Sequence, residues 1–286
     1  MRSIVIFGAG ELGGSLARQL AAADMASRVV LVDDARSVAE GKALDIRQAS
    51  PVDRYSTAVE GTDDPGVAVG ADALVIADRV AAPAGVQSSE WQGDAAVGLL
   101  QRLAYLNPRA LLLCAGARQL DLVERGVREL GLARERLVGS APEGLRAAIV
   151  SMTSLEAGCP PSEISLIVVG RPPGEIIVPW EDASIGGRRA SDVLSPPAIT
   201  RLDGRLGRLW PPGPLTLASA ATRLLRSAAT RSRHSIGAFV AVTREEGDRG
   251  RVAMLPIVVS GSSVAAVLRP TLSTRDRVRL DTVLMR

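Results

Sequence analysis

Apolar residues in the first half of the chain recur in two alternating patterns. Short and almost continuous apolar runs cover residues 3–7 and 28–32, as is typical of parallel strands covered on both faces. Between them, residues 12–23 carry apolar side chains at helical spacing. The alternation then continues with strands predicted over 73–77, 111–115 and 136–139, and helices over 39–48, 95–105, 120–131 and 145–157. This order predicts an α/β fold with a doubly wound parallel sheet.

The pattern changes from about Ser162 onward, where strands and helices no longer alternate regularly. Residues 164–169 and 175–179 are predicted to form antiparallel strands, and 215–230 a long helix. Two more strands are predicted over 236–243 and 251–259, followed by a helix from 274. We therefore expect a Rossmann-type domain over residues 1–140 and a mixed α+β domain over 141–286.

A glycine-rich turn follows the first predicted strand and opens the first helix, with Gly8, Gly10 and Gly13 in the spacing GxGxxG. In dinucleotide-binding folds these glycines permit a tight turn, a close approach to the pyrophosphate and close helix packing. The helix N-terminus presents free N–H groups to phosphate. Asp33 ends the second strand, where a carboxylate accepts hydrogen bonds from a ribose 2′-hydroxyl and favours NAD over NADP. The predicted cofactor-binding set is Gly8, Gly10, Glu11, Leu12, Gly13 and Asp33.

Composition excludes several other classes of protein. The net charge is only +3, and the arginines are scattered without a basic block, so a nucleic-acid partner is not expected. Charges or glycines interrupt every apolar run before it reaches the length of a membrane span, and a cytoplasmic location is expected. Cys114 and Cys159 have no CxxC spacing, and we expect buried thiols without a metal or a disulfide.

Several further segments carry a family resemblance. They are Glu40–Ile46, Gly61–Asp63, Ala71–Ala73, Gly131–Gly139 and Val178–Trp180. With them the chain resembles the lactate/malate dehydrogenase family over essentially its whole length, and its malate dehydrogenases in particular. The resemblance implies a Rossmann NAD-binding domain, the family's α+β C-terminal domain, NAD as cofactor, a small carboxylic acid as substrate and a homo-oligomer, either a dimer or a tetramer.

The resemblance also implies a set of catalytic groups, of which this chain keeps few. Arg146 matches the arginine that clamps the substrate carboxylate, while Glu143 replaces the aspartate that orients the catalytic histidine. Pro173 stands in place of that histidine. The chain's one histidine, His234, lies far along the second half, and we expect it at a surface or a helix end.

The family's mobile loop is also altered. Aligned without gaps, Ala81 and Gln87 take the places of the loop arginines, and Asp94 that of an asparagine. Asp78 replaces a glycine near the expected pyrophosphate, although a shift of one residue would bring Arg79 into the loop-arginine role. In addition, Cys114–Gly116 replaces the family's Ser-Asn-Pro.

The sequence leaves two functions open. The first is an NAD-binding pseudoenzyme of the family with a binding, regulatory or assembly role, because the proton-transferring histidine is absent. The second is an NAD-dependent oxidoreductase, malate dehydrogenase-like, that acts on a small carboxylic acid held by Arg146. In that case Glu143, Glu175 or Arg171 would take over the acid–base or oxyanion duties. Homology alone would label the protein a malate dehydrogenase under either hypothesis.

Overall fold

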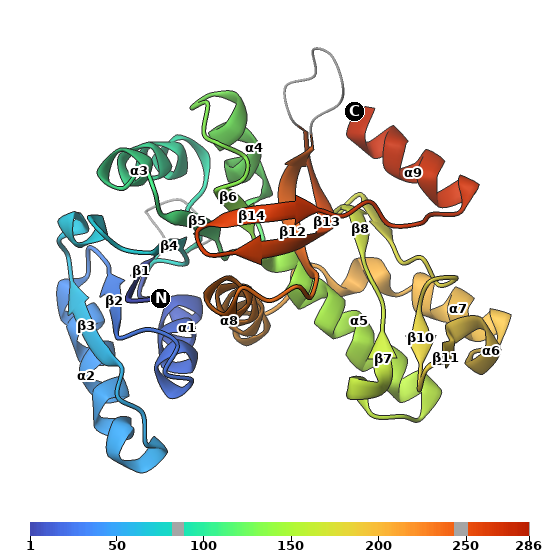
Figure 1. Cartoon of the computed structure of the whole chain (residues 1–286), viewed down its shortest axis with the longest axis horizontal. Helices are drawn as coiled ribbons and strands as arrows, with labels where there is room; N and C mark the ends of the chain where they lie inside the picture. The colour runs from blue at the N-terminus through green and yellow to red at the C-terminus, as the bar shows by residue number, and fades with distance from the viewer. Residues whose placement is uncertain (82–88, 243–250, 286) are drawn as a thin grey trace.

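The computed structural model describes residues 1–81, 89–242 and 251–285. Its parallel strands form one half of a long mixed sheet, with helices on both faces (Figure 1). The parallel strands are β1 (Ser3–Phe7), β2 (Arg28–Val32), β3 (Ala58–Thr62), β4 (Ala73–Ile76), β5 (Leu111–Cys114) and β6 (Leu137–Gly139). The helices that follow them are α1 (Glu11–Ala22), α2 (Arg36–Asp53), α3 (Gly93–Leu106), α4 (Leu120–Arg128) and α5 (Ala141–Ala157).

The strand order of the parallel part is β3-β2-β1-β4-β5-β6, which reverses direction at β1. This order makes a doubly wound sheet with its crevice at the carboxyl ends of β1 and β4. The strands are buried at nearly every position, as in Ile4, Val5 and Ile6 of β1. Helix α1 covers them with Leu12, Leu16 and Leu20, which are buried one turn apart on one face. The predicted fold class is confirmed.

The second half continues the sheet with antiparallel strands in the order β12-β13-β8-β9, and β14 pairs with the far part of β13. A separate small sheet has the order β11-β10-β7. The strands are β7 (Ile164–Ser165), β8 (Val169–Arg171), β9 (Glu175–Ile177), β10 (Ser184–Ile185), β11 (Arg188–Arg189), β12 (Ile236–Val242), β13 (Arg251–Ser260) and β14 (Ser263–Val267). The helices are α6 (Ala190–Val193), α7 (Pro196–Asp203), α8 (Pro214–Thr230) and α9 (Thr274–Met285), with short 3₁₀ turns at Pro65–Ala68, Pro161–Glu163 and Leu206–Leu209.

Three helix predictions were wrong at their ends. The predicted helix 145–157 begins four residues earlier, at Ala141, because Pro142 suits the first turn of a helix and Glu143 donates its N–H to the Ser140 carbonyl. The helix predicted over 39–48 runs from Arg36 to Asp53, with Pro51 tolerated in its last turn. The helix predicted over 120–131 ends at Arg128.

The strand predictions of the second half needed two further corrections. The single strand predicted over 164–169 is two strands, because β7 pairs with β10 whereas β8 pairs with β13 and β9. The strand predicted over 175–179 ends at Ile177. The sequence patterns also gave no prediction for β3 or β14. The last residue of the strand predicted over 236–243 lies outside the described residues.

Helix α8 links the two halves of the molecule. It packs on α1 through a hydrogen bond from the Thr222 hydroxyl to Gln19, and it packs on α5 where Gly144 lies against Pro212 and Thr216. Figure 1 shows α8 between α1 and α5, beneath the β12–β13 strands. The N-terminal half of α5 is held between the sheet and α8, and this half carries Glu143 and Arg146.

Candidate functional site

The predicted glycine turn lies at the carboxyl end of β1. Gly8 has a φ of +113° and its N–H donates to the Val32 carbonyl at 2.7 Å. A Cβ at Gly8 would overlap the Asp78 carbonyl group, and one at Gly13 would overlap the Gly8 carbonyl oxygen. These two positions therefore require glycine for the reasons that the spacing predicted.

Asp33 lies beside this turn, as predicted. Its Oδ2 atom accepts hydrogen bonds from the N–H groups of Ala9, at 2.9 Å, and Val80, at 3.1 Å. Its Oδ1 atom accepts from the N–H of Ala35 at 3.0 Å. The carboxylate is buried, and it holds the glycine turn, the end of β2 and the segment after β4 together.

Asp78 occupies the N-terminus of α1. Its Oδ1 atom accepts a hydrogen bond from the Gly13 N–H at 2.8 Å, and its Oδ2 atom accepts from the Leu12 N–H at 3.1 Å. Its carbonyl oxygen accepts from the Gly10 N–H at 2.9 Å. The side chain is only 7% exposed, so the chain itself supplies an anion to the helix N-terminus.

Of the remaining predicted cofactor residues, Glu11 is exposed at the start of α1, and the Leu12 side chain is buried in the core. Lys42, the chain's one lysine, reaches back from α2 and donates to the Gly10 carbonyl at 2.7 Å. The sequence patterns did not predict this contact. It brings a positive charge next to the glycine turn.

The side chain of Glu90 reaches the neighbouring turn, which follows β5. Its Oε1 atom accepts from the Ala117 N–H at 3.2 Å and its Oε2 atom from the Arg118 N–H at 2.8 Å. Burial raises the pKa of this carboxyl, although the two backbone donors act in the opposite direction. A Cβ at Gly116 would overlap the Glu90 carboxylate. Glycine in this turn therefore makes room for Glu90.

The predicted loop residues do not gather around a substrate. The Arg79 guanidinium lies over the Trp91 ring at 4.4 Å, and Asp94 is 96% exposed in an ion pair with Arg125. Ala81 is exposed, and Gln87 lies outside the described residues. In the alternative alignment, shifted by one residue, Arg79 takes the place of a loop arginine. In the structure its side chain lies over the Trp91 ring.

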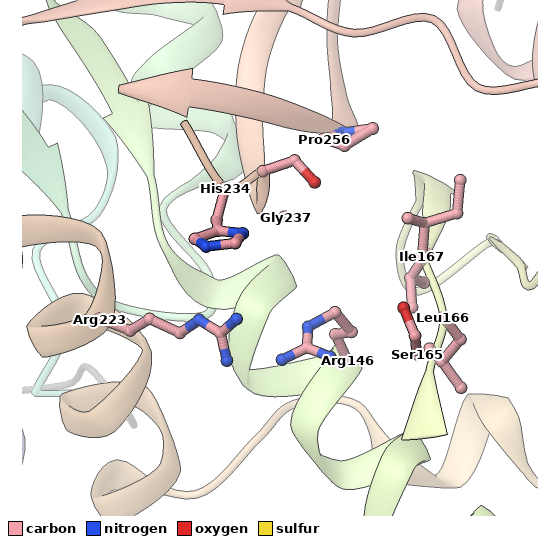
Figure 2. A pocket seen from close by; sticks show the side chains of 10 residues that line it. Arg146, Ser165, Leu166, Ile167, Arg223, His234, Gly237 and Pro256 are labelled. Atoms are coloured by element: carbon pink, nitrogen blue, oxygen red, sulfur yellow. The ribbon is translucent and has the colours of Figure 1, made fainter. Parts of the chain in front are cut away.

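Arg146 lines a cavity of about 220 Å³ together with Arg223 and His234. Figure 2 shows the two guanidinium groups pointing toward one another, with the His234 ring beside them. Arg146 comes from α5 and Arg223 from α8, and His234 precedes β12. The expectation of a surface position for His234 holds, because it is exposed. No pattern in the sequence predicted that it would lie beside Arg146.

Glu143 is the carboxylate that both arginines contact. Its Oε1 atom lies 2.6 Å from Arg146 Nη2 and 3.2 Å from Arg223 Nε, and its Oε2 atom accepts from the Gly237 N–H at 3.2 Å. The Glu143 side chain is 3% exposed. One buried carboxylate thus faces two guanidinium groups, which leaves an excess positive charge in the cavity.

Pro173 lies elsewhere, at the exposed tip of the β8–β9 hairpin. Beside it, Arg171 forms an ion pair with Glu124 at 2.6 Å and donates to the Val252 carbonyl at 2.8 Å. Glu175 pairs with Arg279 of α9 at 2.5 Å. The structure therefore does not bring Arg171 or Glu175 to Arg146, and it engages both in ion pairs with other elements.

Nowhere in the described residues do three or more His, Cys, Asp or Glu side chains gather in a way that could hold a metal ion. None of the helices in the described ranges is both long enough and apolar enough to cross a membrane.

Comparison with known proteins identifies relatives of this sequence. Residues 2–90 match the family model described as lactate/malate dehydrogenase, NAD binding domain, which confirms the predicted NAD-binding domain. The malate dehydrogenase of Thioalkalivibrio sulfidiphilus is 30% identical over 206 residues, covering 71% of this chain and 67% of that protein.

Solved structures share the fold over nearly the whole chain. The lactate dehydrogenase of Cryptosporidium parvum, complexed with lactic acid and nicotinamide adenine dinucleotide, superposes with a TM-score of 0.87 at 20% identity, covering 99% of this chain and 95% of that one. The malate dehydrogenase of Salinibacter ruber gives a TM-score of 0.86 at 18% identity, covering 98% and 93%. At these identities the likeness concerns the fold.

The arrangement at the N-terminus of α1 does not fit a bound diphosphate. A dinucleotide places its diphosphate against the free N–H groups of that helix. Here the N–H groups of Leu12 and Gly13 already donate to the Asp78 carboxylate. The domain that binds NAD in this family is present, but the donors for its phosphates are engaged within the chain.

Proposed function

Because this chain belongs to the lactate/malate dehydrogenase family but has a proline where the family's proton-transferring histidine is expected, we propose that it binds a small carboxylate without oxidising 2-hydroxy acids. Its role would then be binding, regulation or assembly. The observation that carries this proposal is the β8–β9 hairpin, where Pro173 is exposed and its neighbours Arg171 and Glu175 are held in ion pairs.

Proton transfer is the step that this hairpin cannot perform. Oxidation of a hydroxyl group to a carbonyl removes a proton from oxygen as hydride leaves carbon, and a positioned base contributes roughly 10²–10⁴-fold to such a step. A proline side chain has no exchangeable proton. The Arg171 guanidinium stays protonated at any ordinary pH, and the Glu175 carboxylate lies 2.5 Å from Arg279. The hairpin therefore offers no base to a substrate.

Anion binding is supported by the cavity at Arg146. Two guanidinium groups and an imidazole line it, with one buried carboxylate to balance them. Arginine pairs with carboxylates through two parallel hydrogen bonds, which makes it the favoured side chain for this ligand class. The lining residues come from 146–256, and none belongs to the glycine turn or to the turn after β5. An acid bound there would be held by residues outside the glycine turn.

A second candidate function rests on His234. This imidazole lines the same cavity as Arg146, and histidine is the usual proton acceptor near neutral pH. An NAD-dependent oxidoreductase with a non-standard acid–base group would use Arg146 to hold a carboxylate and His234 to take the proton. Hydride transfer would then require the nicotinamide end of the cofactor to reach an acid bound in this cavity.

One experiment separates the two functions. Malate and oxaloacetate are titrated calorimetrically into the protein, and NADH formation or consumption is followed with the same acids. We expect one of the acids to bind, binding to be lost in Arg146→Ala, and no turnover. Arg226→Ala is the matched control, because Arg226 lies three residues beyond Arg223 on α8 and is exposed outside the cavity.

Two outcomes would overturn the proposal. Turnover near the ordinary enzymatic range of about 1–10³ s⁻¹ would contradict it, and loss of that turnover in His234→Asn would establish the second candidate. Equal binding of both acids by the wild type and Arg146→Ala would place the ligand elsewhere.

The division into domains and the assembly state also stay proposals. We propose 1–140 and 141–286 as the two domains, since β6 ends at Gly139 and α5 begins at Ala141. A homo-oligomer is supported by exposed leucines on sheet-flanking helices, with Leu44 of α2 46% exposed and Leu215 of α8 64% exposed. Sedimentation equilibrium of the wild type and Leu215→Glu tests the assembly.

A further inference from the structure

We infer that Asp78 determines what the nucleotide site can bind, because its carboxylate holds the place of a ligand's diphosphate at the N-terminus of α1. A dinucleotide can enter only if this side chain leaves. This inference concerns the glycine turn and is independent of the anion cavity at Arg146, so either one can fail without the other.

The hydrogen bonds of the turn show that its donors are in use. The first N–H groups of a helix have no partner within the helix and serve as the phosphate site of dinucleotide-binding folds. Here Leu12 and Gly13 donate to the Asp78 carboxylate, at 3.1 and 2.8 Å, and Gly10 donates to the Asp78 carbonyl. The Ala9 N–H donates to Asp33. Four donors of the glycine turn are thus satisfied by carboxylates or a carbonyl of the same chain.

The space of the diphosphate is filled as well. A Cβ at Gly10 would overlap the carboxylate of Asp78. In dinucleotide sites the second glycine of the turn lets the pyrophosphate approach the backbone, but here its missing side chain accommodates Asp78. A diphosphate brought to this position would meet a buried negative charge in addition to occupied donors, and like charges at short range repel most strongly where water is excluded.

Glu90 reinforces this arrangement from the same segment of chain. Asp78 and Glu90 face one another across an antiparallel bridge, and the Arg79 N–H donates to the Ser89 carbonyl at 2.9 Å. While Asp78 holds the turn after β1, Glu90 holds the N–H groups of Ala117 and Arg118 after β5. Through these hydrogen bonds the two carboxylates connect the Asp78–Glu90 bridge to the turn after β1 and to the turn after β5.

The test is a titration of NADH, followed by its fluorescence, into the wild type, Asp78→Gly and Asp78→Asn. We expect each variant to bind NADH on the order of tenfold more tightly or better, because a hydrogen bond to a charged group is worth more than a neutral one and two such bonds are removed. Asp192→Asn is the matched control. It removes an equally negative side chain that is exposed on α6, and it should leave the NADH affinity unchanged.

A second measurement does not depend on ligand binding or on the stability of the glycine variant. In the wild type without ligand, the amide protons of Leu12 and Gly13 should be shifted and protected from exchange, as expected for donors to a carboxylate. Asp78→Asn should alter both signals, whereas Asp192→Asn should not. Unprotected amides in the wild type would overturn the inference, and so would one common NADH affinity for the wild type and both Asp78 variants.

Discussion

Glu143 and Arg146 lie one turn apart on α5 and form a two-point ion pair, with Arg146 Nη2 2.6 Å from Oε1 and Arg146 Nε 2.9 Å from Oε2 of the glutamate. In the family that the chain resembles, these positions hold the aspartate that orients the catalytic histidine and the arginine that binds the substrate carboxylate. In this structure the Glu143 carboxylate orients Arg146 itself and also contacts Arg223. The pair therefore holds in place the arginine that lines the anion cavity.

The first prediction concerns the stability that this pair supplies. Glu143→Gln leaves two guanidinium groups facing a neutral amide in a largely buried place, and removing one partner of a buried ion pair costs about 3 kcal/mol. We expect a loss of that size in the free energy of unfolding, measured with urea. Glu129→Gln is the control, because Glu129 is half exposed in a surface pair with Arg125 and should change stability by less than about 1 kcal/mol. Equal effects of the two substitutions would contradict the prediction.

The glycine turn and Asp33 could be predicted because their signals are local. A buried strand, a glycine spacing and an acidic residue at the next strand's end are all written into the first 33 residues, and the structure places them together. The presence of Asp78 at the expected pyrophosphate was also visible in the sequence. Its hydrogen bonds to Leu12 and Gly13 were not, because they join positions more than sixty residues apart.

The anion cavity was hidden from sequence patterns for a similar reason. Arg146 and His234 are brought together by the antiparallel pairing of β12 with β6, in which Phe239 faces Gly139. The hydrophobic pattern of each strand predicts which of its faces is buried, but it does not specify which strand is its partner. Conversely, the family resemblance assigns Pro173 and Arg146 to one catalytic site, at the positions of its histidine and of its substrate-binding arginine. In the structure, Pro173 does not line the cavity at Arg146.

The second prediction concerns the two thiols. Cys114 lies in β5 with no exposed surface, and burial raises its pKa to about 12. Since the thiolate is the reactive form, Cys114 should not react with a disulfide reagent at pH 8 in the folded protein. Half-buried Cys159 should account for the one reacting thiol, and denaturant should expose the second. Fast labelling in Cys159→Ser would contradict this assignment.

The third prediction is a pH dependence from Glu90. Burial raises the pKa of this carboxyl above its ordinary value of about 4.5, so between that value and the folded-state pKa the folded protein binds more protons than the unfolded chain. Its contribution to stability is therefore most favourable at the acidic end and declines as pH rises through the folded pKa. The free energy of unfolding of the wild type, relative to Glu90→Gln, should fall as the pH rises above about 4.5.

Glu60 provides a control of opposite sign. The Arg28 guanidinium beside it lowers the pKa of Glu60, so its stabilising contribution is present above the ordinary carboxyl value and is lost as pH falls through the lowered one. The difference between the wild type and Glu60→Gln should therefore increase with pH in the acidic range. A Glu90 difference that does not vary with pH, or that increases with it, would contradict the prediction for Glu90.

The fourth prediction is that restoring the missing histidine does not restore the reaction. Pro173→His places an imidazole at the exposed tip of the β8–β9 hairpin, while the Arg146 cavity lies elsewhere and the Asp78 carboxylate still occupies the N-terminus of α1. General acid–base catalysis requires the imidazole within hydrogen-bond reach of the substrate oxygen, and positioning is worth as much as the acid itself or more. We expect no NADH consumption with oxaloacetate or pyruvate from Pro173→His.

The double variant Pro173→His with Asp78→Gly should bind NADH more tightly and remain inactive, because residue 173 does not line the cavity in which Arg146 would hold the acid. Turnover in the single variant would show that the hairpin reaches the substrate, and that the proline alone is what separates this chain from its active relatives.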